Sequence, residues 1–465
     1  MNSKIKEILQ DTIESIKGTD QDFTTGKLGR AIFLLAVPMV LEMAMESVFA
    51  VVDIFFVSKL GSDAVATVGI TESVMTLLYA ISLGLGMGTT ALIARRVGEG
   101  KMKEASVTAA QSILLGFILS IPIAIAGIYF APDLLELMGS SKEMIESGFR
   151  YPQIVIGFNI VIMLLFIINS IFRGAGDAAL SMRILWVSNF INIVLDPCLI
   201  FGLGPFPELG IAGAATATVI GRGTGVIFQL YLLFNRKHRI EIIPSDFKLR
   251  VKLMLKLIRL SLGGIGQFLI STTSWIGLVR IMSTFGSSVL AGYTIAIRIL
   301  IFSLLPSWGL SNAASTMVGQ NLGAKKPDRA ERSVIITAKI NFIFLTMVTV
   351  IFLIFPAELI RIFTPDPGVI KAGTEALRFI SFVLPFYAIG MVMIQALNGS
   401  GDTKTPTIIN FFCFWLTELP VAYILSMKLG FHSHGVYLAI ILADIMIATI
   451  GIIVFRRGKW KLKVV

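Results

Sequence analysis

The stretch PMVLEMAMESVFAVVDIFFVSKLG, residues 38–61, decides how the rest of this chain is organised. It is long and apolar enough to cross a bilayer as a helix, yet it carries three carboxylates, Glu42, Glu46 and Asp53. A charge inside hydrocarbon is costly, so such residues are expected to be functional. Steps of four and seven residues place all three near one helix face. Because burial favours the neutral form of a carboxyl group, Asp53 is a candidate for taking up and releasing a proton. An acid satisfied by neighbouring helices is the alternative.

The composition is that of a membrane protein with many spans. Of 465 residues, 55% are hydrophobic and 15% charged, and the mean hydropathy is +0.83. Soluble domains are far less apolar. Twelve apolar runs, each long enough to cross the hydrocarbon as a helix, predict an all-α membrane protein. The predicted spans are residues 31–58, 68–94, 105–130, 151–172, 180–202, 211–234, 256–283, 290–318, 333–355, 376–397, 405–427 and 435–455.

Basic residues predict which side of the membrane each loop occupies. With the N-terminus inside, the inner loops hold 29 of the 40 Lys and Arg residues. Excess positive charge marks the cytoplasmic side, so both termini are predicted to be cytoplasmic. The net charge of +11 therefore reflects topology rather than nucleic-acid binding. The outer side holds seven: Lys59, Lys142, Arg150, Arg361, Lys371, Arg378 and Lys428. The other four lie within predicted spans: Arg222, Arg280, Arg298 and Lys339.

The N-terminal tail, residues 1–30, lacks the apolar core of a cleaved signal peptide over its first 27 residues. Apolar residues recur there at helical spacing among Lys and Glu: Ile5, Ile8, Leu9, Ile13 and Ile16. This pattern predicts a short amphipathic helix on the cytoplasmic surface, with a disordered tail as the alternative.

An internal repeat divides the chain. At an offset of 225 residues Gly61 falls on Gly286, and RGAGD (173–177) falls on NGSGD (398–402). At the same offset Gly210 meets Gly435. Since six spans is an even number, the two halves are predicted to be parallel bundles related by a pseudo-two-fold axis along the membrane normal, with a cleft between them. The predicted division is a tail at 1–30, a lobe at 31–235, a cytoplasmic linker at 236–256, a lobe at 257–455 and a basic tail at 456–465.

The fifth span contains NIVLDPCLIFG, residues 192–202. Asn192 lies one turn before Asp196 on the same face, and Pro197 leaves the Ile193 carbonyl without its helical partner. An acid, an amide and a freed carbonyl together form an oxygen-rich place for a proton or Na⁺. A polar clamp that fixes a helix kink is the alternative.

These stretches together resemble the MATE (multidrug and toxic compound extrusion) transporters of the DinF-like, prokaryotic type. The resemblance covers nearly the whole chain and rests on the first-span and fifth-span stretches quoted above and on five more. These are GLGMGTTALIARRVGEG (84–100), FRGAGD (172–177), LGIAGAATATVIGR (209–222), MVGQNLGAKK (317–326) and LNGSGDTKTP (397–406). A single Gly-rich motif is weak evidence for the family, but the whole set of motifs in this order is specific.

The resemblance implies a coupling-ion site within the first half. Asp53 and Asp196 would form its acidic pair. The supporting residues would be Asn192, Asn169, Tyr151 and one threonine of the sixth span, either Thr216 or Thr218. Pro38 matches the family's first-span proline, at which that helix is proposed to bend, and Pro197 is a second candidate hinge.

The second half departs from the first in its acids. At the offset of 225, Asp53 falls on Leu278 and Asp196 on Val421, which favours coupling in the first half. Glu418 and Asp444 are predicted to make polar contacts between helices.

The candidate substrate cleft comprises Glu42, Glu46, Glu72, Met39, Met43 and Phe49. The glutamates of this set either attract a cationic substrate or pair with Arg222, Arg280 or Arg298.

The predicted function is a secondary antiporter in a prokaryotic inner or plasma membrane. It would export amphipathic, often cationic organic compounds in exchange for H⁺ or Na⁺ by alternating access, as a monomer without a cofactor, a metal centre or nucleic acid. A flippase for lipid-linked oligosaccharides is the alternative. An ATP-driven pump would need a phosphate-binding motif, and a membrane enzyme a cluster of catalytic polar residues; the sequence contains neither.

Overall fold

The computed structural model describes residues 2–19, 21–235 and 239–463, and in this part of the chain every regular element is helical. Ten helices are long and apolar enough to cross a membrane, and two further spans are pairs of shorter helices that meet at a bend. The prediction of an all-α protein with twelve spans is therefore confirmed.

The first half contains α2 to α10. Their bounds are α2 Leu28–Ser58, α3 Ser62–Gly98, α4 Met102–Tyr129, α5 Ala131–Leu137, α6 Lys142–Gly148, α7 Arg150–Gly157, α8 Asn159–Ala175, α9 Ala178–Phe201 and α10 Ile211–Phe234. A separate helix, α1 (Asn2–Lys17), precedes them, and a short 3₁₀ helix, η1 (Pro244–Phe247), follows them.

The second half contains α11 to α19. Their bounds are α11 Val251–Met282, α12 Ser287–Gly323, α13 Pro327–Ile354, α14 Pro356–Arg361, α15 Pro367–Ser381, α16 Leu384–Gly399, α17 Lys404–Asn410, α18 Leu419–Tyr423 and α19 Ser433–Arg456. The eleventh span joins α17 and α18 to two π-helical segments, η3 (Phe411–Glu418) and η4 (Ile424–Lys428). Short 3₁₀ helices lie at η2 (Ser283–Phe285) and η5 (Lys459–Leu462).

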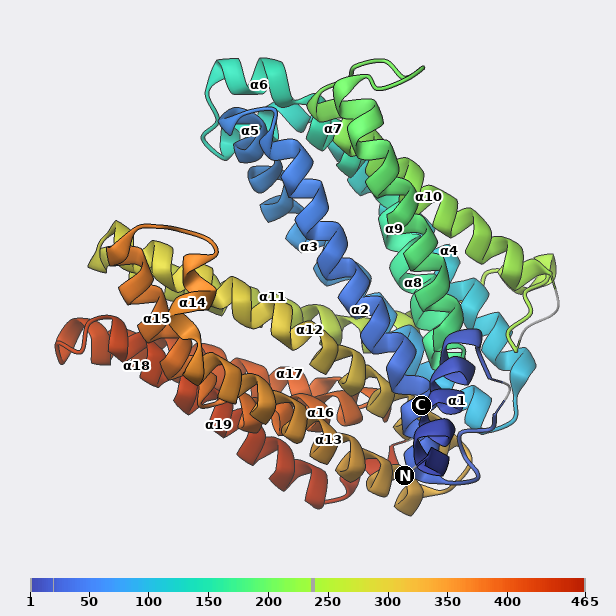
Figure 1. Ribbon diagram of the computed structural model, residues 1–465. Helices are drawn as coiled ribbons and strands as arrows, with labels where there is room; N and C mark the ends of the chain where they lie inside the picture. The colour runs from blue at the N-terminus through green and yellow to red at the C-terminus, as the bar shows by residue number, and fades with distance from the viewer. Residues whose placement is uncertain (1, 20, 236–238, 464–465) are drawn as a thin grey trace.

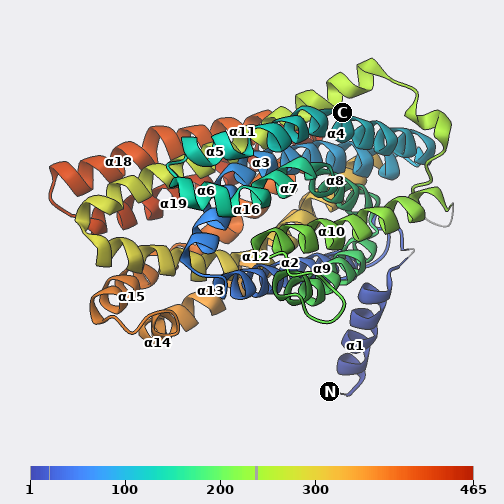
Figure 2. The same ribbon diagram turned by 90° about the horizontal axis from the view of Figure 1, so that it is seen from above.

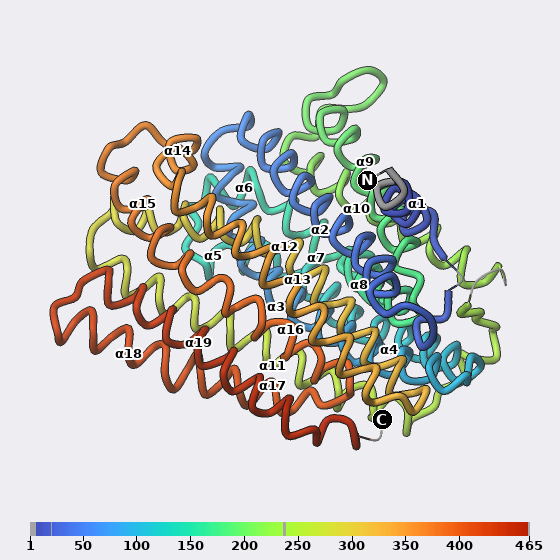
Figure 3. The backbone as a smooth tube through the Cα atoms, turned by 60° about the horizontal axis from the view of Figure 1, so that its bottom comes forward, coloured from blue at the N-terminus to red at the C-terminus, as the bar shows by residue number. Residues whose placement is uncertain are grey.

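Two bundles make up the molecule (Figure 1). The blue-to-green helices α2 to α10 form one, and the yellow-to-red helices α11 to α19 form the other. The bundles meet at the end where both termini lie and diverge toward the opposite end, so the molecule has the outline of a V. Figure 2 shows the long helices running in nearly one direction, and Figure 3 places α17, α18 and α19 along one edge of the second bundle.

Each half breaks one span at the same point of the repeat. The angle between α7 and α8 is 41°, with Phe158 between them, and the angle between α15 and α16 is 54°, with Val383 in the break, 225 residues later. In the first half, the Asn159 side-chain amide donates to the Ile156 carbonyl at 2.8 Å, which satisfies an acceptor freed by the break. In the second half, Pro385 has no N–H to continue the helix.

Backbone angles confirm the repeat and correct one detail of it. Gly61 and Gly286 have φ of 104° and 102°, a conformation that favours glycine. Before the last span, however, the residue equivalent to Gly210 in the second half is His432. Both have a positive φ, 57° and 51°, at the same point before a spanning helix. The offset there is 222, so the predicted match of Gly210 with Gly435 is wrong. The connection after α9 differs in length from its counterpart, which shifts the register.

Close backbone contacts join the bundles at the end near the termini. A Cβ atom added at Gly98 on α3 would lie 1.9 Å from the backbone oxygen of Gln320 on α12. One added at Gly323 would lie 2.2 Å from the Arg95 oxygen. The Gln320 side chain also donates to the Gly174 carbonyl at 3.0 Å. Glycine is therefore needed for the two bundles to meet this tightly.

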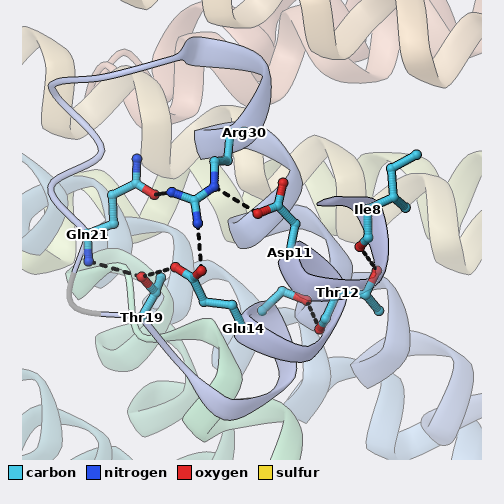
Figure 4. Close-up of polar contacts among 8 residues, drawn as sticks. Ile8, Asp11, Thr12, Glu14, Thr19, Gln21 and Arg30 are labelled. Carbon is cyan, nitrogen blue, oxygen red and sulfur yellow. Dashed lines mark hydrogen bonds and ion pairs between the residues drawn. The ribbon is translucent and has the colours of Figure 1, made fainter. Parts of the chain in front are cut away.

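The predicted N-terminal helix is present as α1. Figure 4 shows how Arg30, at the start of α2, holds it: Nε donates to Asp11 at 2.8 Å and Nη2 to Glu14 at 2.6 Å. Figure 2 shows α1 running across the direction of the spanning helices. Ile8 and Leu9 are exposed on it, as an interfacial helix requires; the Ile5 side chain lies outside the described residues.

The connection between the bundles docks against α4. The Gln111 side chain donates to the carbonyls of Asp246 and Lys248 and accepts from the Arg250 N–H. Lys103 forms an ion pair of 2.9 Å with Asp246, which is buried. Residues 236–238 of the predicted linker lie outside the described part, and α11 already begins at Val251.

Candidate functional site

The fifth and sixth spans, α9 and α10, form a buried polar cluster. Asn192 Nδ2 lies 3.4 Å from Asp196 Oδ1 and 3.2 Å from the hydroxyl oxygen of Thr218 on α10, and it donates to both. Gly221 permits this close approach, because a Cβ there would lie 2.9 Å from that of Asn192. The two residues on α9 are almost completely buried.

Two oxygen atoms of this cluster remain free. Asp196 Oδ2 and Asn192 Oδ1 are buried and have no hydrogen-bond partner among the described residues. A buried oxygen without a donor is energetically costly. Asp196 Oδ2 is therefore suited to receive a proton, and both oxygens are suited to coordinate a small cation.

Asp53 on α2 lies beside the cluster. Its carboxyl group is close enough to Asp196 for their charges to interact, and it also interacts with Arg222. Tyr151 is buried, and both aspartates act on it electrostatically. The Asp53 carboxylate has no ion pair or hydrogen bond in the described chain. The structure thus brings together five of the predicted coupling-site residues: Asp53, Asp196, Asn192, Tyr151 and Thr218.

Two other predicted residues lie apart from this cluster. Asn169 Oδ1 accepts a hydrogen bond of 2.6 Å from Gln229, which is three turns, or roughly 16 Å, along α10 from Thr218. Thr216 donates to the Ala212 carbonyl of its own helix, so it does not join Asn192. Between the two threonines that the sequence left open, the geometry selects Thr218.

The two candidate hinges lie inside continuous helices. Pro38 is within α2 and Pro197 within α9, so each removes one backbone hydrogen bond without ending its helix. The Trp186 indole N–H on α9 donates to the Leu41 carbonyl of α2 at 3.1 Å, close to Pro38.

Three of the candidate cleft residues already contact other parts of the protein. Glu46 lies 3.5 Å from Arg222, which also stacks over the Phe49 ring with its guanidinium carbon 5.0 Å from the centroid. Met39 is buried against the second bundle, where a Cβ at Gly309 would meet its backbone.

The other cleft residues differ in exposure. Met43 is half-buried. Glu72 is exposed and interacts electrostatically with Asp53. Of the arginines weighed as partners, Arg222 is buried, whereas Arg280 and Arg298 are exposed.

The partner of Glu42 is a residue that the sequence placed in a loop. Glu42 Oε1 lies 3.6 Å from Arg173 Nη1, and both side chains are largely buried. At the offset of 225 these two positions are Gln267 and Asn398, which hydrogen-bond each other at 3.0 and 3.1 Å. One half therefore has an ion pair where the other has two hydrogen-bonded amides. A comparison of the two halves, position by position, could have predicted that Glu42 pairs with Arg173.

The second bundle holds its own buried acids. Ser274 donates to Glu418 at 2.6 Å, a contact between helices as predicted. Asp444, nine-tenths buried, interacts electrostatically with Glu418. At the offset of 222, Asp444 takes the place of Arg222, so the sign of the charge is reversed between the halves. No group of three or more His, Cys, Asp or Glu suited to a metal occurs among the described residues.

Comparisons with known proteins agree with this architecture. The model of the MatE family matches residues 38–198 and 264–424, one match in each half. The chain is 27% identical over 443 residues to "Probable multidrug resistance protein NorM" of Thermotoga maritima, with 94% of both proteins covered. It is 28% identical to "FAD transporter" of Shewanella oneidensis, with 88% of this chain and 89% of that protein covered.

A solved structure has the same fold. It is described as "Outward-facing conformation of a multidrug resistance MATE family transporter of the MOP superfamily". The TM-score is 0.88 at 26% identity, with 95% of this chain and 98% of that chain covered.

Proposed function

Because the chain belongs to the MatE family, as its sequence motifs indicated, we propose that it is a secondary active transporter that exports amphipathic organic compounds, often cationic, in exchange for H⁺ or Na⁺. The relatives named for multidrug resistance and for FAD transport support an organic cargo of moderate size. The protein would act as a monomer in a prokaryotic inner membrane, with both termini cytoplasmic.

The coupling site in this proposal is the cluster of Asp53, Asp196, Asn192, Thr218 and Tyr151. The observation that carries it is the pair of free buried oxygens, Asp196 Oδ2 and Asn192 Oδ1, beside a second carboxyl group. Two carboxylates near each other in an apolar setting repel, so binding of one cation relieves both burial and repulsion. Cation binding therefore changes the balance of forces between α2 and α9.

Alternating access follows from how the bundles meet. In the proposed orientation the V is open to the outside and is closed at the cytoplasmic end by the contacts of Gly98 and Gly323 (Figure 1). The solved structure described as outward-facing supports this assignment. Cation binding on α2 would bend or shift that helix at Pro38, which lies beside the closed end, and so favour separation there.

The available energy is sufficient for export without ATP. One elementary charge crossing 100 mV is worth about 2.3 kcal/mol, so one proton at roughly 150 mV supplies about 3.5 kcal/mol. At about 1.4 kcal/mol per factor of ten, this sustains a concentration ratio of a few hundred.

Dye efflux from cells tests the proposal and identifies the ion. The pH gradient and the Na⁺ gradient are dissipated separately while efflux of a fluorescent cation is followed. Loss of efflux after one treatment assigns that ion, whereas efflux that persists after both treatments contradicts antiport.

The alternative, a lipid-linked oligosaccharide flippase, requires a wide basic cleft. Arg222 is paired with Glu46, whereas Arg280, Arg298 and Lys339 are exposed. Vesicles that transport the dye but do not translocate a labelled lipid precursor would exclude it.

A further inference from the structure

The second bundle holds a cavity of about 640 Å³ far from the coupling cluster. α14 and α15 form it, at the end of the bundle remote from the C-terminus (Figures 1 and 3). Ile370 and Phe379 provide apolar wall, and Arg361, Lys371 and Arg378 bring three positive charges to it. It is an open depression in the protein surface rather than an enclosed pocket.

This cluster of basic residues is unusual for the chain, because most of its Lys and Arg residues are predicted to lie on the cytoplasmic side. On the predicted topology only seven Lys and Arg residues lie on the outer side, and three of them line this one cavity. None of the three forms an ion pair within the described chain. The carboxylate that lines the cavity, Glu375, already pairs with His434 at 2.7 Å. With three cations and one carboxylate, the cavity lining has a net positive charge.

A hydrogen-bond donor accompanies the charge. The hydroxyl oxygen of Thr374, which also lines the cavity, is buried and has no hydrogen-bond partner among the described residues. A hydroxyl and three cations are the groups that recognise a phosphate. Exposed apolar side chains adjoin them: Ile362 and Phe363 follow Arg361 directly, and Phe382 follows the last residue of α15.

We propose that this cavity binds the phosphate of an anionic phospholipid in the outer leaflet. Arg361, Lys371 and Arg378 would hold the phosphate, Thr374 would donate to one of its oxygens, and the exposed apolar residues would contact the acyl chains. The exposed apolar side chains favour a lipid over free phosphate. The inference uses the predicted orientation and does not depend on how the transporter is coupled to an ion.

The test compares two variants that each lose three charges from the outer side. The full chain is purified in detergent, and binding of fluorescent phosphatidylglycerol is measured by anisotropy. The test variant is Arg361→Gln with Lys371→Gln and Arg378→Gln. The matched control is Lys59→Gln with Lys142→Gln and Arg150→Gln, which lie outside the cavity.

We expect the test variant to bind this lipid at least about tenfold more weakly, because each lost cation removes attraction to the anionic lipid. The control should bind like the wild type, and Thr374→Val should weaken binding by a few-fold. Equal affinities in the two triple variants would overturn the proposal. So would inorganic phosphate that binds as tightly as the lipid. Size-exclusion profiles check that each variant is folded. If the triple variant misfolds, lipid binding by the single variants Lys371→Gln and Thr374→Val tests the proposal instead, and wild-type affinity in both would overturn it.

Discussion

Replacing Gly98 by Ala should open the cytoplasmic end. The new Cβ would lie 1.9 Å from the Gln320 oxygen on the other bundle, whereas an ordinary contact is about 3.4 Å or more. The obstacle is backbone rather than the flexible end of a side chain, so the bundles must separate by roughly an ångström. Overpacking of this kind costs about 1–3 kcal/mol. Because the contact exists only when this end is closed, the ratio of closed to open molecules should fall by a factor of about 5 to 150.

Distance measurements between spin labels provide the assay. Ser62 and Ser287, the exposed first residues of α3 and α12, lie at the diverging ends and are replaced by labelled Cys. The native Cys198 and Cys413 are first replaced by Ser. We expect Gly98→Ala to shorten the distance between the labels, since rocking that opens one end brings the other together.

Gly69→Ala is the matched control, because Gly69 lies on the same helix and a Cβ there meets nothing within 4 Å. The same distance distribution in the Gly98→Ala and Gly69→Ala proteins would refute the reasoning. It would mean that the cytoplasmic contact does not determine which state the transporter occupies.

Three further predictions follow from single contacts. Thr218→Val should lower cation-driven transport about fivefold, from the loss of one hydrogen bond of about 1 kcal/mol, whereas Thr216→Val should leave the transport rate in proteoliposomes unchanged. Glu42→Gln leaves Arg173 buried without its ion pair and should lower the free energy of unfolding by about 3 kcal/mol, read as a fall in the thermal midpoint in detergent; an unchanged midpoint would contradict the pairing. Arg30→Gln should release α1, seen as faster amide hydrogen exchange in that helix, and unaltered exchange would show that other contacts hold it.

The spans and the repeat could be predicted because they depend on composition along the chain. Apolar length is sufficient to locate a helix in a bilayer. The backbone angles that Gly61 and Gly286 share are encoded by residue type at a fixed offset. The offset failed only near Gly210, where the connection after α9 differs in length from its counterpart, a difference that a single constant offset cannot express.

The site could be predicted only in part. The spacing of residues along a helix predicts which of them share a face, but it does not predict which neighbouring helix packs against that face. Asp196 and Asn192 were recognisable from their one-turn spacing. The partner of Asn192 depends on how α10 is rotated, and this selects Thr218 over Thr216. Asn169 lies apart because it is near the C-terminal end of α8, where it meets Gln229 near the C-terminal end of α10.

The central claim is that Asp53 and Asp196 bind the coupling cation. The most direct measurement follows cation flux into proteoliposomes with enclosed pH-sensitive and Na⁺-sensitive dyes while substrate moves the opposite way. The account predicts that Asp53→Asn with Asp196→Asn abolishes this flux, whereas Glu418→Gln with Asp444→Asn, which removes two buried acids from the second bundle, preserves it. Substrate-dependent cation flux that is undiminished in the first variant would contradict the account.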